Sequence, residues 1–192
     1  MLKKETVLSE HNLKIQNTYH LLDDLLNWTR AQQGNIPFEP EQLNLNDICD
    51  EMLKTLTPVA KEKNIGINCL FWETLNVFAD RSMLRTVLRN LVTNAIKFTN
   101  KGGTINIHAE QNRKNVSISI KDNGIGIPSD ILLKLFDISE KITNKGTSGE
   151  TGTGLGLLLA KNLWKNMVAE FGQKVRKGKG VCSGLHCRIF SI

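Results

Sequence analysis

Three polar residues at helical spacing form the first group in the chain that could do chemistry. Asn90, Asn94 and Lys97 are four and three residues apart, so a helix would bring them to one face. Amide oxygens are ligands that suit Mg2+, and a lysine ammonium suits a phosphate group. Because polar faces are the norm for surface helices, this segment taken alone favours a solvated face over a binding site.

A second segment, residues 122–128, reads Asp-Asn-Gly-Ile-Gly-Ile-Pro and directly follows a run that alternates like a strand. Gly124 and Gly126 would let the backbone turn sharply and bring it, with Ile127, close to a ligand. An ionised Asp122 only accepts hydrogen bonds, so it would select an amine donor on that ligand. A simple turn with a local side-chain bond from the aspartate is an equally good interpretation of this segment alone.

The third segment, residues 152–157, places glycines at alternate positions at the start of an expected helix. Unpaired backbone N–H groups and the helix dipole make such a start an anion site. The spacing is neither that of dinucleotide-binding folds nor that of a P-loop. Close packing of the helix start on a neighbouring element is the structural alternative. The candidate residues here are Gly152, Thr153, Gly154, Leu155 and Gly156.

Helices and antiparallel strand pairs must position these segments, because the apolar pattern shows no strand–helix–strand repeat. This order predicts an α+β fold, with helices layered on one face of a mixed, mostly antiparallel sheet and one long helix before it. Expected helices cover residues 1–33, 46–59, 80–99, 129–136 and 154–171; expected strands cover 65–71, 75–79, 104–110, 115–121 and two stretches of 172–192.

For two of these helices the sequence predicts the N-cap residue and the buried face. Asn46 is expected to cap the helix that follows it, and Pro58 to kink that helix or begin a new turn. Asp80 is expected to cap the helix that carries Asn90 and its neighbours. The predicted buried residues are Ile48, Met52, Leu53, Leu56 and Val59 on the first of these helices, and Leu84, Leu88, Leu91, Ala95 and Phe98 on the second.

The composition is that of a globular domain, since 40% of the 192 residues are hydrophobic and 23% are charged. The net charge is +6, but the basic residues are scattered, with residues 174–179 the densest run, and no nucleic-acid-binding motif accompanies them. We therefore expect no nucleic-acid partner. No run approaches the roughly 20 apolar residues that span a bilayer, so no membrane contact is expected of this segment.

The four cysteines do not predict a metal site. Cys182, His186 and Cys187 supply one loose cluster, whereas a structural zinc site needs four ligands, usually in two tight pairs. We expect these two cysteines, and Cys49 and Cys69, to be free thiols in a reducing cytoplasm.

The order and spacing of the three segments resemble the catalytic domain of sensor histidine kinases, in the superfamily that includes type II topoisomerases, heat-shock chaperones and MutL. Residues 90–99 are similar to the family's N box, 122–128 to its G1 box, 135–137 to its F box and 152–157 to its G2 box. Residues 8–32 resemble the second helix of the dimerisation hairpin. The resemblance implies a Bergerat-type ATP-binding fold, with residues 1–33 a remnant of the dimerisation domain and 34–192 the catalytic domain.

The resemblance also implies a role for each candidate residue. Asp122 would accept a hydrogen bond from the adenine amine, Asn94 with Asn90 would hold Mg2+ on the phosphates, and Lys97 would reach a phosphate. The glycine segment would cradle the phosphates beneath a lid formed by residues 138–151. ATP-hydrolysing members carry a glutamate at the position of Asn90, and an amide cannot act as a general base. ATP and Mg2+ are the expected cofactors, and phosphoryl transfer fits better than hydrolysis.

The histidine that such a kinase phosphorylates is missing. The four histidines are followed by Asn, Leu, Ala and Cys, whereas the family's acceptor usually precedes an acidic residue. The resemblance then implies a protein histidine kinase domain that does not autophosphorylate as this fragment. It also implies a response-regulator receiver domain as partner and a homodimer as the full-length form. The expected location is the cytoplasm, within a parent protein that could carry a membrane anchor. Two alternatives stay open: a non-catalytic ATP-binding module that pairs with a kinase through its N-terminal helix, and a serine kinase of the anti-sigma type.

Overall fold

A computed structural model describes residues 37–71, 74–111, 115–135, 144–167, 170–175 and 183–190, together with residues 26, 29 and 137. The described elements, in chain order, are β1 (Glu41–Asn44), α2 (Leu45–Glu62), β2 (Gly66–Cys69), β3 (Asn76–Ala79), α3 (Arg81–Phe98), β4 (Thr104–Gln111), β5 (Asn115–Asp122), α4 (Ser129–Lys134), α5 (Gly156–Asn166), β6 (Glu170–Val175) and β7 (Ser183–Phe190).

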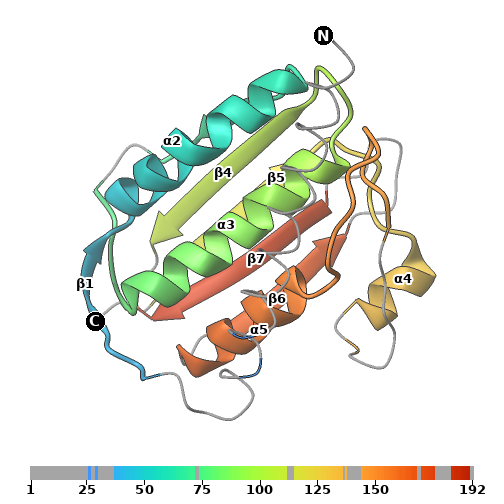
Figure 1. Cartoon of the computed structure of the whole chain (residues 1–192). Coiled ribbons are helices and arrows are strands. Elements are labelled where there is room, and N and C mark those ends of the chain that lie inside the picture. The colour runs from blue at the N-terminus through green and yellow to red at the C-terminus, as the bar shows by residue number, and fades with distance from the viewer. Residues whose placement is uncertain are drawn as a thin grey trace, which may run out of the picture.

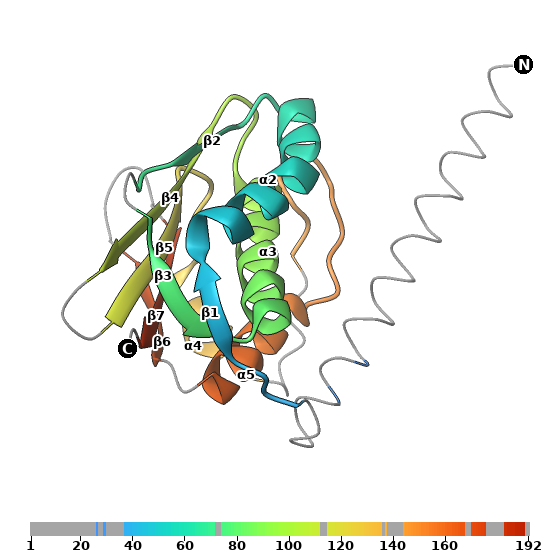
Figure 2. The ribbon, with the colours of Figure 1, turned by 90° about the vertical axis from the view of Figure 1, so that its left-hand side faces the viewer.

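Five of the strands form one mixed sheet in the order β2-β4-β5-β7-β6. β2 runs parallel to β4, and the other neighbouring pairs are antiparallel. β1 and β3 form a separate antiparallel pair. Helices α2, α3 and α5 cover one face of the sheet, and α4 lies outside this layer (Figure 1). In the view turned by 90°, the strands lie on one side and helices α2 and α3 on the other (Figure 2). The predicted α+β arrangement in two layers is therefore confirmed.

Helix α3 forms where the sequence predicts it. The Asp80 side chain caps its start by accepting a hydrogen bond from the Met83 amide at 2.9 Å. The predicted inner face is buried through Leu84, Leu88, Leu91 and Ala95, whereas Phe98 in the last turn is half-buried. Each fully buried leucine side chain contributes roughly 1.5–3 kcal/mol, so this face holds α3 firmly on the sheet.

Helix α2 differs from the prediction at its N-cap, at its end and at one residue of its expected buried face. Asn44, not Asn46, is its N-cap, because the Asn44 side chain accepts a hydrogen bond from the Asn46 amide at 2.9 Å. The helix continues through Pro58 to its end at Glu62. Val59 is 49% exposed and Ala60 is buried instead, because Ala60 continues the four-residue spacing of the buried face.

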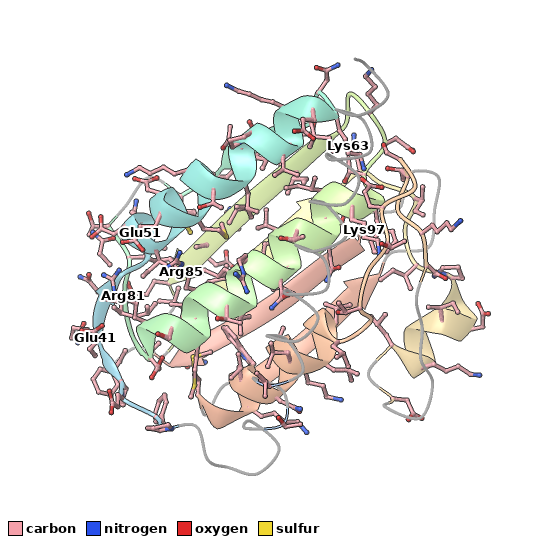
Figure 3. All side chains as sticks on the ribbon, viewed as in Figure 1. Glu41, Glu51, Lys63, Arg81, Arg85 and Lys97 are labelled. Carbon is pink, nitrogen blue, oxygen red and sulfur yellow. The ribbon has the colours of Figure 1, made fainter. Side chains whose placement is uncertain are left out.

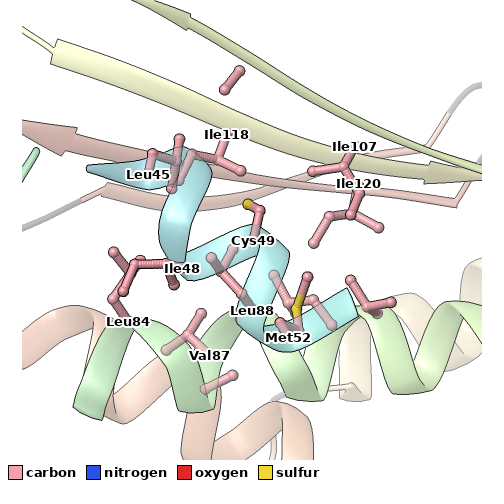
Figure 4. Packing of buried hydrophobic residues seen from close by; sticks show 14 of the residues in the cluster. Leu45, Ile48, Cys49, Met52, Leu84, Val87, Leu88, Ile107, Ile118 and Ile120 are labelled. Atoms are coloured by element: carbon pink, nitrogen blue, oxygen red, sulfur yellow. The ribbon is translucent and has the colours of Figure 1, made fainter. Parts of the chain in front are cut away.

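The core lies between the helices and the sheet. Figure 4 shows Ile48, Cys49 and Met52 of α2 beside Leu84, Val87 and Leu88 of α3, beneath sheet residues that include Ile107, Ile118 and Ile120. Cys49 and Cys69 are free thiols, as predicted. Burial raises the pKa of the Cys49 thiol to about 12, so this side chain behaves as a small apolar core residue.

The C-terminal third differs from the prediction at both ends of its helix. Gly154 has a φ of +75°, a left-handed conformation that no α-helix contains, so α5 begins at Gly156. The helix ends at Asn166, because residues from Glu170 onward pair with β7, Glu170 lying opposite Arg188. The two predicted tail strands are confirmed as β6 and β7, with β6 beginning two residues earlier than the predicted range.

The predicted helix over residues 1–33 falls almost entirely outside the described residues. Only Leu26 and Thr29 are described; both are helical, and the Thr29 hydroxyl donates to the Leu26 carbonyl at 2.9 Å. Within the described part of the chain, no helix combines the length and apolarity needed to cross a bilayer.

Candidate functional site

The polar face of α3 carries the first candidate residues. Asn90, Asn94 and Lys97 are all half-buried on this helix, beside the buried stripe that anchors it. The Asn90 side-chain amide donates to the Thr86 carbonyl at 3.0 Å. Its Oδ1 atom faces Gly156, where an added β-carbon would lie only 2.9 Å away. Asn90 therefore lies against Gly156, which is both the first residue of α5 and the last glycine of the predicted segment.

Lys97 lies at the other end of the same glycine segment. Its ammonium sits 4.8 Å from the centre of the Phe98 ring, and a β-carbon at Gly152 would lie 2.5 Å from the Lys97 Nζ atom. Burial lowers the pKa of Lys97, while the charge of Glu150 acts in the opposite direction. A cation partly removed from water beside exposed glycine amides suits a phosphate ligand.

The loop that follows β5 is hydrogen-bonded to the end of α3 and lies close against it. Asp122 is 5% exposed, and its Oδ1 accepts a hydrogen bond from the Gly124 amide at 3.0 Å. The Ile125 amide donates to the Phe98 carbonyl at 3.0 Å, and a β-carbon on Gly124 would overlap that carbonyl oxygen. Gly126 has a φ of +70°, so glycine is needed here for its conformation.

The side chains of this loop differ in exposure. Ile125 is 55% exposed, a large apolar surface for a ligand ring, and Ile127 is half-buried beside it. A buried carboxylate next to an exposed apolar side chain is an arrangement that can bind an aromatic ring carrying an amine.

The start of α5 presents backbone donors. Within the described part of the chain, no side-chain hydrogen bond caps this helix, and its first turn contains no acidic residue. Immediately before it, the Leu155 amide donates to the Thr153 hydroxyl at 3.2 Å, which shapes the turn around Gly154. Uncapped N–H groups at the positive end of an 11-residue helix favour an anion, as the glycine segment predicts.

Residues 146–150 belong to the predicted lid, directly before the glycine segment, and they form a turn against the end of α3. The Gly146 amide donates to the Glu150 carbonyl at 2.8 Å, and the Thr147 amide to the Lys97 carbonyl at 3.0 Å. The Lys63 ammonium, at the end of α2, contacts Glu150 Oε1 at 2.9 Å. Sequence reasoning assigned no role to Lys63, and it included Thr147 and Glu150 only as part of the lid. Their position just before the glycine segment was the available signal for these two residues.

The C-terminal half of α3 is where the three predicted segments meet. Phe98 contacts the loop after Asp122, Lys97 contacts Gly152, and Asn90 contacts Gly156. Figure 3 shows Lys63 and Lys97 together at this end of the helix layer, with Glu51 and Arg81 at the opposite end. Phe136 and residues 138–143, which belong to the predicted F box and lid, lie outside the described residues.

The donor set fits a magnesium ion held together with phosphates better than an ion held by protein alone. Asn90 and Asn94 offer amide oxygens on one helix face, next to a site that suits an anion. Among the residues that the structure describes, no cluster of three His, Cys, Asp or Glu side chains could hold a metal. Mg2+ commonly takes one or two protein ligands and completes its shell with phosphate oxygens and water.

Comparison with known proteins agrees with this geometry. Residues 79–188 match the family described as histidine kinase-, DNA gyrase B-, and HSP90-like ATPase. The sensor protein GacS of Pseudomonas syringae pv. syringae is 31% identical over 171 residues, which cover 85% of this chain and 19% of GacS. The chain therefore spans about a fifth of that relative's length.

Solved structures of histidine kinases share the fold. The catalytic domain of ThkA is 28% identical, with a TM-score of 0.67 over 79% of this chain and 97% of that domain. ThkA in complex with the response regulator protein TrrA gives a TM-score of 0.71 at 24% identity, covering all of this chain and 52% of that one. Full-length ShkA in complex with AMPPNP gives 0.77 at 23% identity, covering 98% of this chain and 39% of ShkA.

Proposed function

The chain belongs to the family of histidine kinase-, DNA gyrase B- and HSP90-like ATPases, and we propose that it is the ATP-binding catalytic domain of a sensor histidine kinase. It would transfer the γ-phosphoryl group of Mg-ATP to a histidine outside these 192 residues. The convergence of three separate segments on the C-terminal half of α3 is the observation that carries this proposal.

Each predicted residue has a role at this site. Asp122 would accept the adenine amine, with Gly124, Gly126 and Ile127 shaping the ring site. The buried position of Asp122 supports this role, because a shielded carboxylate discriminates more strongly in favour of a donor than an exposed one.

The phosphates would lie between α3 and the start of α5. Lys97 lies against Gly152, and together with the backbone amides of the glycine segment, from Gly152 to Gly156, it would hold the phosphate oxygens. Asn94 and Asn90 would hold Mg2+ there, and the ion would neutralise charge that develops on the transferred group. This chain's own contribution is to bind and orient the nucleotide.

Transfer is favoured over hydrolysis by the chemistry of Asn90. Its amide donates to the Thr86 carbonyl and has no basic group that could take a proton from water. The acceptor histidine, the dimer and the response regulator belong to the proposed whole protein. The structure of ThkA in complex with the response regulator protein TrrA supports the last of these. We place the domain in the cytoplasm, where its proposed substrate ATP is available. The non-catalytic alternative is not favoured, because several relatives, among them RcsC of Escherichia coli, are named as sensor histidine kinases.

Calorimetry tests nucleotide binding directly. Wild type is expected to bind Mg-ATP, and Asp122→Ala to bind it at least about tenfold more weakly, because the amine donor loses a charged acceptor. Asp50→Ala removes an exposed carboxylate from the N-terminal half of α2, at the end away from the site, and serves as the matched control. Equal affinities for wild type and Asp122→Ala would remove the assignment of the nucleotide site.

Phosphoryl transfer needs a second assay. The chain is incubated with γ-labelled ATP and a separate histidine kinase dimerisation hairpin, with Lys97→Ala as a loss-of-function comparison. Label on the hairpin histidine, reduced in Lys97→Ala, is expected. A chain that binds Mg-ATP but never labels a hairpin would instead support a non-catalytic nucleotide-binding module.

A further inference from the structure

A buried ammonium lies outside the three nucleotide segments and links them. Lys63 follows the last residue of α2 and is 8% exposed. Its Nζ atom lies 2.9 Å from Glu150 Oε1, 2.7 Å from the Thr147 hydroxyl and 2.8 Å from the Ile96 carbonyl, with the Lys97 carbonyl at 3.1 Å. An ammonium has three protons, so these four acceptors saturate it.

Two of these acceptors belong to the last turn of α3, where carbonyls have no partner within the helix. A positive charge at this end also meets the negative end of the helix dipole. Lys63 therefore caps α3 from a different helix, at the turn that carries Lys97. The labelled side chains in Figure 3 show Lys63 and Lys97 at the same end of the helix layer.

The other two acceptors fix the turn at residues 146–150. Glu150 uses one carboxylate oxygen for Lys63 and the other for the Ser148 amide at 2.9 Å. Thr147 donates its hydroxyl to the Thr99 carbonyl at 2.7 Å and its amide to the Lys97 carbonyl. The turn is thus held on the end of α3 by an ion pair whose lysine is buried and by a set of hydrogen bonds to the backbone.

Burial acts to raise the pKa of Glu150, but its bonds to Lys63 and to backbone amides outweigh burial and lower the pKa overall. The charged form of Glu150 is therefore the one that the fold stabilises. Gly152 follows only two residues later and lies against the Lys97 ammonium. The position of Glu150 consequently sets how close the glycine segment comes to Lys97.

We propose that Lys63 is a positioning residue for nucleotide binding: through Glu150 and Thr147 it holds the turn at 146–150 on α3, and so keeps Gly152 beside Lys97 in a geometry that receives the phosphates. This inference rests on the proposed function. Lys63 itself contacts protein groups, and acts on the nucleotide only through the turn.

The test compares wild type with Lys63→Met, Glu150→Gln, the double variant and Glu51→Gln. Glu150→Gln keeps the size and one acceptor oxygen of the side chain, and offers a variant that folds if Lys63→Met does not. Glu51→Gln weakens the exposed ion pair between Glu51 and Arg81, at 3.0 Å, and is the matched control. Calorimetry with Mg-AMPPNP gives the affinity, urea unfolding gives the stability, and amide hydrogen exchange without nucleotide reports on residues 146–148.

Lys63→Met is expected to weaken Mg-AMPPNP binding about tenfold or more, and Glu150→Gln to weaken it less. The double variant should resemble Lys63→Met alone, because both side chains act through the same turn. Amides of residues 146–148 should exchange faster in both single variants and at the wild-type rate in Glu51→Gln. A purely structural role would lower stability while leaving the affinity of the folded protein unchanged.

Wild-type affinity in both Lys63→Met and Glu150→Gln would overturn the proposal, even if both variants were less stable. Additive effects of the two substitutions on affinity would also count against a shared turn. If wild type itself fails to bind Mg-AMPPNP, the proposed function fails; in that case unchanged exchange at residues 146–148 in Lys63→Met would show separately that Lys63 does not hold the turn.

Discussion

Gly124→Ala should damage both the fold and the nucleotide site. A β-carbon at Gly124 would overlap the Phe98 carbonyl oxygen, and would lie 2.8 Å from the Phe98 carbonyl carbon and 2.9 Å from Asp122 Oδ1. Real β-carbons essentially never show contacts below 3.0 Å. Two of the three opposing atoms are backbone of the last turn of α3 and cannot rotate aside, so the loop itself must move.

The movement would strain two hydrogen bonds of 3.0 Å, from the Ile125 amide to Phe98 and from the Gly124 amide to Asp122. A hydrogen bond contributes about 0.5–1.5 kcal/mol net, and overpacking costs about 1–3 kcal/mol. We therefore expect the free energy of unfolding to fall by about 2–6 kcal/mol. Asp122 moves with the loop, so the dissociation constant for Mg-ATP should rise at least about tenfold.

Urea unfolding and calorimetry measure the two effects, with Gly66→Ala as the matched control. An added β-carbon at Gly66 meets no atom within 4 Å. That variant should be unchanged, or more stable by about 0.4–1 kcal/mol because its unfolded chain is more restricted. The reasoning is refuted if Gly124→Ala and Gly66→Ala show the same stability and the same affinity for Mg-ATP.

Further predictions concern three side chains around the end of α3. Because burial lowers the pKa of Lys97, the fold disfavours its charge, so Lys97→Met should raise the free energy of unfolding at neutral pH while weakening Mg-ATP binding in calorimetry; lower stability with unchanged affinity would contradict this. Thr99 is fully buried, and its hydroxyl has no hydrogen-bond partner among the described residues. Thr99→Val should therefore leave the free energy of unfolding unchanged or raise it by about 1 kcal/mol in urea unfolding. A fall in that free energy of more than about 1 kcal/mol would show that the hydroxyl is paired. The pKa of Glu150 is lowered from 4.5, so its contribution is complete above that pH and is lost as the pH falls. The difference in unfolding free energy between wild type and Glu150→Gln should therefore shrink as the pH falls below 4.5, and a difference independent of pH would exclude a role for the Glu150 charge.

Local pattern predicted most of the layered fold. The buried stripe of α3 and the cap at Asp80 follow from spacing and side-chain type over a few residues, and both are confirmed. The errors at Asn46 and at the end of α5 arose where a neighbouring element decided the boundary. Residues from Glu170 onward pair with β7, and a local helical pattern does not show that competition.

The candidate site was predictable as three segments but not as one geometry. Asp122, Asn90 and Lys97 could be selected because their residue types and spacing suit particular ligands. The contacts of Phe98 with the loop after Asp122, and of Lys97 with Gly152, depend on how α3, β5 and α5 pack together. Roles for individual residues stay predictions until nucleotide binding is measured.

The sequence by itself determined which residues could meet adenine, phosphate and magnesium, because these choices depend on functional groups and on helical or strand periodicity. Only the tertiary structure brought Lys63 into the proposed nucleotide site, as the residue that would position the turn at 146–150. Its partners Thr147 and Glu150 lie 84 and 87 residues away. A lysine at the end of a helix is ordinarily solvated, and burial beside a carboxylate and two helix carbonyls makes this one different. That burial depends on how the elements pack together, and no periodic pattern in the sequence indicates it.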